Sequence, residues 1–110
     1  EELLKIIEGN LLTDNDRQAE IEITGGYVSD LLSDVMGNAG ENNVWITVMR
    51  HLNAVAVASL VGINPIIFAR NLVPDEAVII KANAENICLL NSSLSTFEIV
   101  GRIYNLLHSN

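Results

Sequence analysis

Cationic side chains follow two neighbouring apolar runs of the sequence, at the points where buried strands are expected to end. Arg50 and His51 come after one run and Arg70 after the next, in a chain with only six Lys and Arg residues. A guanidinium and an imidazole placed together can clamp a phosphate or a carboxylate. The same residues could equally be solvated loop residues at the start of a helix. The sequence therefore leaves an anion site and a plain loop as open alternatives.

A second feature is the Thr24-Gly25-Gly26 turn, which follows an alternation of charged and apolar residues over 20–24. Period-two alternation predicts a half-buried strand over those residues, and the glycines are expected to end it. Two glycines allow a ligand to approach the backbone closely. A tight turn from strand to helix without any ligand is the alternative. Ser29 is the predicted cap of the helix that follows.

Ligands of open parallel sheets bind beyond the carboxyl ends of the strands, where helix starts also offer free backbone N–H groups to anions. We therefore predict a site for a small anionic ligand at that edge, with no catalytic and no metal-binding residues. Replacing Gly26 by Val or Arg50 by Ala is expected to abolish binding while the fold survives. The predicted site residues are Thr24, Gly25, Gly26, Ser29, Arg50, His51, Asn53, Arg70 and Ser92.

The apolar pattern predicts the elements that must hold this site. From residue 44 onward, three short continuous apolar runs alternate with three helical patterns, which is typical of strand–helix–strand crossovers on a parallel sheet. The first forty residues add one or two strands and two helices. We expect a single α/β domain over residues 1–110, with a mostly parallel sheet of four or five strands. The expected strands are 11–13, 20–24, 44–49, 65–69 and 87–90, and the expected helices are 2–8, one starting at Ser29, 52–61, 74–85 and one starting at Ser95, with a turn at 14–17.

The composition disfavours several partners. The net charge is −8 and the six cations are scattered, which argues against binding to nucleic acid or to an anionic membrane surface. The single cysteine, Cys88, lies in an apolar run, so we expect a buried thiol, no disulfide within the chain and a cytoplasmic location. His51, His108 and Cys88 are too few for a four-ligand zinc site, and no cofactor is implied.

Missing motifs exclude several enzyme classes. The sequence contains no G-x-x-x-x-G-K-[ST], G-x-G-x-x-G or G-x-S-x-G pattern, so it lacks the signatures of P-loop kinases, dinucleotide-binding folds and serine hydrolases. A pairing of His51 with Ser92 or Ser93 is the catalytic arrangement that strand ends would allow. Nothing in the sequence demonstrates contact between them, and we expect a non-enzyme.

The block over residues 22–36 resembles the DRTGG domain family. The resemblance continues through 44–48, 51–60, 74–76 and 94–98, so it covers nearly the whole chain. Of the name-giving pentapeptide, Thr24-Gly25-Gly26 is present, whereas Glu22-Ile23 stand where Asp-Arg would.

The resemblance implies a three-layer α/β/α domain, similar to the N-terminal, non-catalytic domain of bacterial HPr kinase/phosphorylase. It implies a regulatory role, with an adenine nucleotide as the first expectation for the ligand. The high apolar content and the 52–61 helix, which has little polar surface, favour a homo-oligomer. The alternative is a protein–protein interaction or oligomerisation domain with no small ligand.

Overall fold

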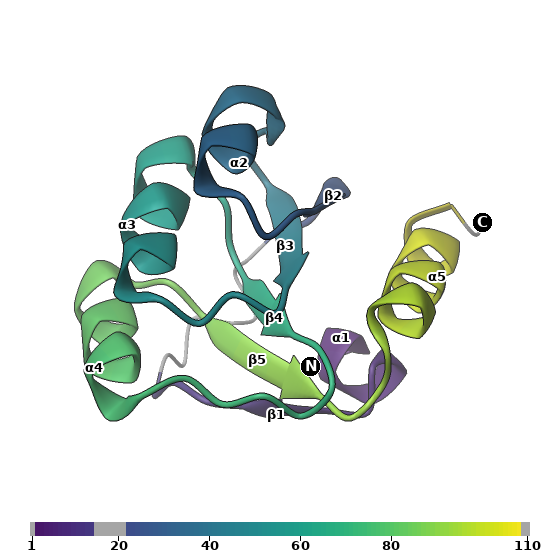
Figure 1. Ribbon diagram of the computed structural model, residues 1–110. Coiled ribbons are helices and arrows are strands. Elements are labelled where there is room, and N and C mark those ends of the chain that lie inside the picture. Colours follow the sequence, from purple (N-terminus) through teal and green to yellow (C-terminus); the bar gives the residue numbers. More distant parts are fainter. Residues whose placement is uncertain (1, 15–21, 109–110) are drawn as a thin grey trace.

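The computed structural model describes residues 2–14 and 22–108 (Figure 1). Short helices and strands alternate along these ranges. In chain order they are α1 (Glu2–Ile6), β1 (Gly9–Leu11), β2 (Gly25–Val28), α2 (Leu32–Asn38), β3 (Asn43–Thr47), α3 (Leu52–Val61), β4 (Ile66–Phe68), α4 (Glu76–Glu85), β5 (Leu89–Ser92) and α5 (Thr96–His108).

The strands form a five-stranded sheet in the order β1-β5-β4-β3-β2. β2, β3, β4 and β5 run parallel to one another, and β1 pairs with β5 in the antiparallel sense. The predicted mostly parallel sheet is therefore confirmed. The carboxyl ends of β2 to β5 lie together at what we call the carboxyl edge, and their amino ends lie at the opposite, amino edge.

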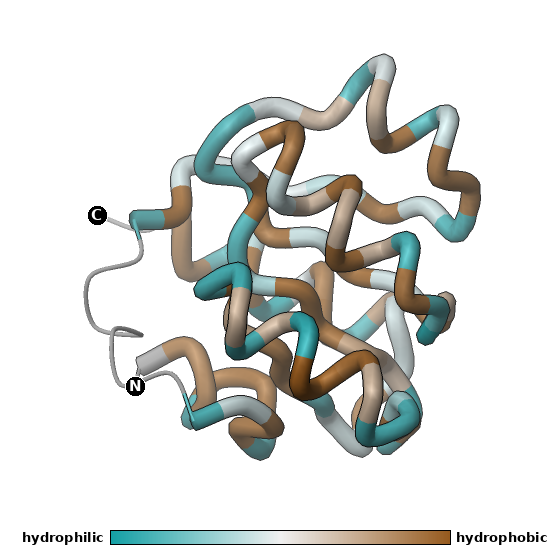
Figure 2. Tube along the Cα trace, turned by 90° about the vertical axis from the view of Figure 1, so that its left-hand side faces the viewer, coloured by the Kyte–Doolittle hydropathy of each residue, from teal (hydrophilic) through white to brown (hydrophobic). Residues whose placement is uncertain are grey.

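Helices cover both faces of the sheet, with α2, α3 and α4 on one face and α1 and α5 on the other (Figure 1). Successive strand residues point to opposite faces, so Trp45 packs in one buried cluster and Ile46 in the other. Coverage of both faces explains why the strands are continuous apolar runs. In Figure 2 hydrophobic residues recur through the central segments, whereas many turns are hydrophilic. The architecture is the predicted three-layer α/β/α arrangement.

The position of β2 differs from the prediction. The strand occupies Gly25–Val28 instead of 20–24, of which Glu20 and Ile21 lie outside the described residues and 22–24 are not in a strand. The glycines therefore begin the strand instead of ending it. Pairing with β3 fixes this register, because Gly25 lies opposite Asn43 and Tyr27 lies opposite the buried Trp45. The local alternation over 20–24 carried no information on that distant partner.

The helix starts are closer to expectation. α3 has the predicted bounds, and α4 and α5 begin within two residues of the predicted positions. Ser95 caps α5, because its Oγ accepts a hydrogen bond of 3.2 Å from the N–H of Glu98. Ser29 does not cap α2: its Oγ accepts from the N–H of Leu31, which is itself the N-cap residue.

The remaining differences are small shifts in bounds. β1 begins two residues before the predicted 11–13, at Gly9, and β5 extends to Ser92. Of the predicted turn over 14–17, residues 15–17 lie outside the described ranges. No helix within those ranges is long and apolar enough to cross a membrane.

Candidate ligand-binding site

A cavity of about 360 Å³ opens at the carboxyl edge, where the loops that follow β3 and β4 meet the starts of α3 and α4. Both loops belong to crossovers of neighbouring parallel strands, so the topology alone brings them together. The lining combines a guanidinium, an imidazole and a carboxylate with apolar side chains. The lining residues are Val48, Met49, Arg50, His51, Val73, Pro74 and Asp75.

Arg50 supplies the positive charge of this cavity. Its side chain is exposed, and its guanidinium forms no hydrogen bond or ion pair with any residue in the described part of the chain. An arginine without a protein counter-ion keeps all five of its donors available to a ligand. A chain of net charge −8 has few such groups to offer.

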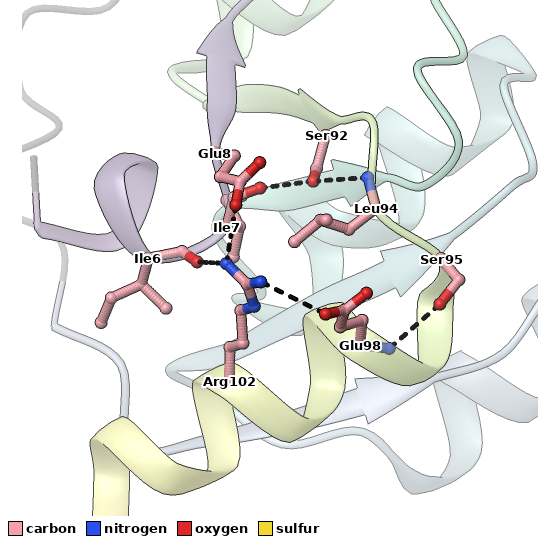
Figure 3. Close-up of polar contacts among 8 residues, drawn as sticks. All are labelled: Ile6, Ile7, Glu8, Ser92, Leu94, Ser95, Glu98 and Arg102. Carbon is pink, nitrogen blue, oxygen red and sulfur yellow. Dashed lines mark hydrogen bonds and ion pairs between the residues drawn. The ribbon is translucent and has the colours of Figure 1, made fainter.

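Arg102 illustrates the opposite case, an arginine that the fold uses internally (Figure 3). From α5 its guanidinium donates to the carbonyl of Ile6 at 3.0 Å and pairs with Glu8 at 3.1 Å and Glu98 at 3.2 Å. These contacts clamp the end of α1 onto α5. They also raise the pKa of Arg102, chiefly through hydrogen bonding to Glu8 and Glu98.

His51 is placed by its role as the N-cap residue of α3. Its Nδ1 accepts a hydrogen bond of 3.1 Å from the N–H of Asn53. The neutral ring therefore carries its proton on Nε2. That N–H is left to donate to a ligand, while the backbone of the helix fixes the ring beside Arg50.

Asp75 occupies the equivalent N-cap position at the start of α4, and it was not among the predicted site residues. Its backbone carbonyl accepts from the N–H of Val78 at 3.0 Å, but its side chain forms no capping hydrogen bond. The carboxylate also forms no ion pair with Arg50 or with any other cation among the described residues. The signal that could have found it is an acid that follows Pro74 in the loop after a strand.

Asp30 organises the neighbouring loop, and it was not among the predicted site residues. Its Oδ1 accepts from Thr47 Oγ1 at 2.6 Å and from the N–H of Val48 at 3.0 Å. Thr47 Oγ1 in turn accepts from the N–H of Met49 at 3.0 Å. These bonds fix the segment that leads from β3 directly into Arg50.

The Thr24-Gly25-Gly26 segment lies at the amino edge and not at the carboxyl edge, so its predicted place beside Arg50 is wrong. Gly25 lies opposite Asn43, the first residue of β3. Gly25 and Gly26 instead line a separate, mainly apolar cavity of about 240 Å³ between β2 and α5. The physical reason is the register of β2, which starts at the glycines.

Ser92 is also misplaced as a ligand residue, because it belongs to the interior (Figure 3). The side chain is fully buried, its Oγ donates to the carbonyl of Ile7, and the same oxygen accepts from the N–H of Leu94 at 3.1 Å. Both capacities of the hydroxyl are used by the fold. None of the hydrogen bonds among the described residues joins Ser92 to His51.

The other predicted residues lie at the carboxyl edge but outside the cavity lining. Ser29 follows β2, and its carbonyl accepts a hydrogen bond of 2.8 Å from Trp45 Nε1. Asn53 sits in the first turn of α3, with an exposed side chain. Arg70 follows β4, is exposed, and adopts a left-handed backbone conformation with φ of 58°. Of the nine predicted residues, the structure thus brings Arg50 and His51 into one cavity.

Residues 2–14 and 22–108 contain no group of three or more His, Cys, Asp or Glu side chains arranged to hold a metal ion. Cys88 is buried in β-sheet packing, and burial raises the pKa of its thiol. The polar residues that line the carboxyl-edge cavity are Arg50, His51 and Asp75, which offer hydrogen bonds and charge pairing.

No family model matches the sequence, and no curated protein matches it. Among solved structures, the fold is similar to the CBS and DRTGG domains of the regulatory region of Clostridium perfringens pyrophosphatase, complexed with the activator diadenosine tetraphosphate. The TM-score is 0.76, with 14% sequence identity over 92% of this chain. The chain spans 44% of the length of that structure. At this identity the likeness concerns the fold, and it agrees with the resemblance seen in the sequence.

Proposed function

We propose, on the premise that the chain folds as a DRTGG-like domain, that it is a non-catalytic regulatory module that binds a small anionic ligand. The binding site is the carboxyl-edge cavity, and Arg50 and His51 hold the anion. The observation that carries this proposal is the Arg50 guanidinium, which lines the cavity with no counter-ion among the described residues. A phosphate or carboxylate would complete it.

An adenine nucleotide is the first candidate for the ligand. The similar pyrophosphatase region is complexed with a nucleotide activator, diadenosine tetraphosphate, which supports this choice. In the cavity, the Arg50 fork and His51 Nε2 would bind a phosphate. The apolar lining from Val48, Met49 and Val73 would contact the less polar part of the nucleotide.

Binding without catalysis is supported by the composition of the cavity lining. It includes no hydroxyl or thiol side chain that could act as a nucleophile beside His51. The buried hydroxyl of Ser92 is committed to Ile7 and Leu94. We accordingly propose that the module acts by changing its own stability or contacts when ligand binds. The lone buried cysteine fits a reducing compartment, and we propose a cytoplasmic location.

Isothermal titration calorimetry tests the proposal with AMP, ATP, diadenosine tetraphosphate and acetyl phosphate as probes. We expect at least one nucleotide to bind, and Arg50→Ala to weaken it by roughly ten- to a hundredfold, the loss expected for charge-assisted hydrogen bonds. Arg70→Ala is the matched control, since it removes the same charge from the same edge outside the cavity. Unchanged affinity in Arg50→Ala, or no binding of any probe to the wild type, would reject the proposal.

A second candidate function, self-association, is favoured by apolar side chains on the outer helix layer. Leu60 of α3 is 77% exposed and Ile80 of α4 is 61% exposed. Leu52, Ala56 and Leu60 recur at four-residue spacing, so they share one face of α3. We propose that a second copy of the chain covers this face. Sedimentation equilibrium should show a dimer that Leu60→Glu dissociates, and a concentration-independent monomer would reject it.

A further inference from the structure

Asp75 is the one carboxylate in the lining of the carboxyl-edge cavity, and the fold makes no use of it. An acid at a helix N-cap normally accepts from the N–H groups of the first turn. Here the side chain makes no such bond, and no cation in the described ranges pairs with it. The lining of the cavity therefore holds both an unpaired carboxylate, that of Asp75, and an unpaired guanidinium, that of Arg50.

This combination constrains the chemistry of a ligand. A purely anionic molecule such as inorganic phosphate satisfies Arg50 but is repelled by Asp75, and the net charge of −8 adds to the repulsion. Asp75 and Arg50 form no ion pair with each other. A ligand that satisfies both must carry O–H or N–H donors together with its anionic group, and the hydroxyl groups of a ribose are donors of this kind that accompany a phosphate.

We propose that Asp75 is a specificity residue that accepts hydrogen bonds from the vicinal hydroxyl groups of a ribose whose phosphate is held by Arg50. The inference rests on the proposed function, because it assigns a second contact to the same ligand. A carboxylate that accepts a hydrogen bond from a ribose hydroxyl is a recurring way to recognise ribose. The apolar side chains of Val73 and Pro74, on the same loop, would contact the sugar carbons.

The side chain of Asp75 can bind a ligand without weakening the start of α4, because the helix does not depend on it. Pro74 is buried and fixes the backbone ahead of α4, while Asp75 adopts an extended conformation with φ of −63° and ψ of 157°. The helix start is held by backbone bonds from Val78 and Ile79 to the Asp75 carbonyl. Changing the carboxylate therefore leaves the helix contacts in place.

Titration calorimetry tests the inference with AMP, 2′,3′-dideoxy-AMP and inorganic phosphate, against wild type and Asp75→Asn. The dideoxy compound lacks both ribose hydroxyls but keeps the phosphate and the base. We expect the wild type to prefer AMP over 2′,3′-dideoxy-AMP by about tenfold, the range for hydrogen bonds to a charged group. In Asp75→Asn this preference should fall to within about twofold, and phosphate should bind more tightly than to wild type.

Glu76→Gln is the matched control, because it removes one negative charge at the next residue, outside the cavity lining. It should keep the full preference for AMP. Equal affinities of the wild type for AMP and the dideoxy compound would overturn the role of Asp75 while leaving the proposed function intact. An unchanged preference in Asp75→Asn would do the same. Failure of the wild type to bind any of the three would instead count against the proposed function.

Discussion

The carboxylate of Asp30 accepts a hydrogen bond of 2.6 Å from the buried hydroxyl of Thr47, which joins the loop after β2 to the last residue of β3. The same oxygen accepts from the N–H of Val48, and Thr47 Oγ1 accepts from the N–H of Met49. The N–H groups of Val48 and Met49, the two residues between the strand and Arg50, are therefore both held by a polar contact. The donor fork proposed to hold the ligand is thus supported by a preorganised loop.

Replacing Thr47 by Val should lower both stability and ligand affinity. The change keeps the shape of the side chain but removes the donor to Asp30 and the acceptor for Met49, which costs about 1–2 kcal/mol of unfolding free energy. Because the loop before Arg50 loses a restraint, we also expect affinity for the ligand to fall several-fold. Urea denaturation and titration calorimetry measure the two effects. Thr47→Ser should restore both, and a Thr47→Val protein as stable as wild type would contradict the account.

The contact between Tyr27 and Asp34 predicts a pH dependence of stability. Hydrogen bonds from the side chains of Ser29 and Tyr27 hold the pKa of Asp34 below its ordinary value of 3.8, and the bond to Asp34 raises the pKa of Tyr27 above 10.0. Asp34 therefore contributes stability that is present above pH 3.8 and is lost as the pH falls through its folded pKa. Tyr27 contributes stability that is present below pH 10.0 and is lost as the pH rises through its folded pKa.

Unfolding titrations of wild type, Asp34→Asn and Tyr27→Phe from acid to alkaline pH check this dependence. Asp34→Asn should be less stable than wild type at neutral pH, and the difference should shrink below the folded pKa of Asp34. In Tyr27→Phe, the free energy of unfolding should no longer show the part of its fall at alkaline pH that the Tyr27 hydroxyl causes. A constant offset between wild type and Asp34→Asn at every pH would show that the carboxylate charge plays no part.

Gly26→Ala should leave ligand binding unchanged, contrary to the expectation from the sequence that Gly26 lines the anion site. A Cβ at this position would lie 3.3 Å from Val44 Cγ1, so Val44 must shift by a few tenths of an ångström. We expect a stability change of at most about 1 kcal/mol. Thermal unfolding and titration with the confirmed ligand check both statements. Loss of affinity in a folded Gly26→Ala protein would instead place the site at the amino edge, where Gly26 lies.

Ser92→Ala should destabilise the fold without affecting the ligand. Loss of the buried hydroxyl leaves the carbonyl of Ile7 and the N–H of Leu94 without their partner, at a cost of about 1–3 kcal/mol. For a domain of this size the melting temperature should fall by several degrees. Ser93→Ala is the control, since Ser93 is exposed. Equal stability of the two variants would contradict the structural role of Ser92.

The parts of the fold that the sequence predicted are those set by local signals. α3 and the cap of α5 depend on residues within one or two turns of each other, such as Ser95 and Glu98. The buried strands β3 to β5 were found from their apolar runs, although their ends moved by a few residues. Such patterns involve only residues close in sequence, so they can be recognised without knowing the fold.

Apart from the cap of α2, which was expected at Ser29, the errors concern pairings between distant residues. The register of β2 depends on contact with β3, and the partner of Ser92 is Ile7, 85 positions away in the sequence. Neither can be seen from spacing. Arg50 and His51 were predicted at the carboxyl edge because they follow an apolar run of the sequence directly. Asp75, which lines the same cavity, was not predicted, because its loop meets theirs only through the neighbouring crossover.

The central claim is that the ligand binds at the carboxyl edge through Arg50. Two-dimensional NMR of the ¹⁵N-labelled chain titrated with AMP tests it most directly, because each backbone amide reports its own surroundings. The account predicts shifts that saturate together at residues 50–53 and 75–77, with none at 24–26, and their loss in Arg50→Ala. Shifts centred on 24–26 and the β2–α5 cavity, or a spectrum that AMP leaves unchanged, would contradict it.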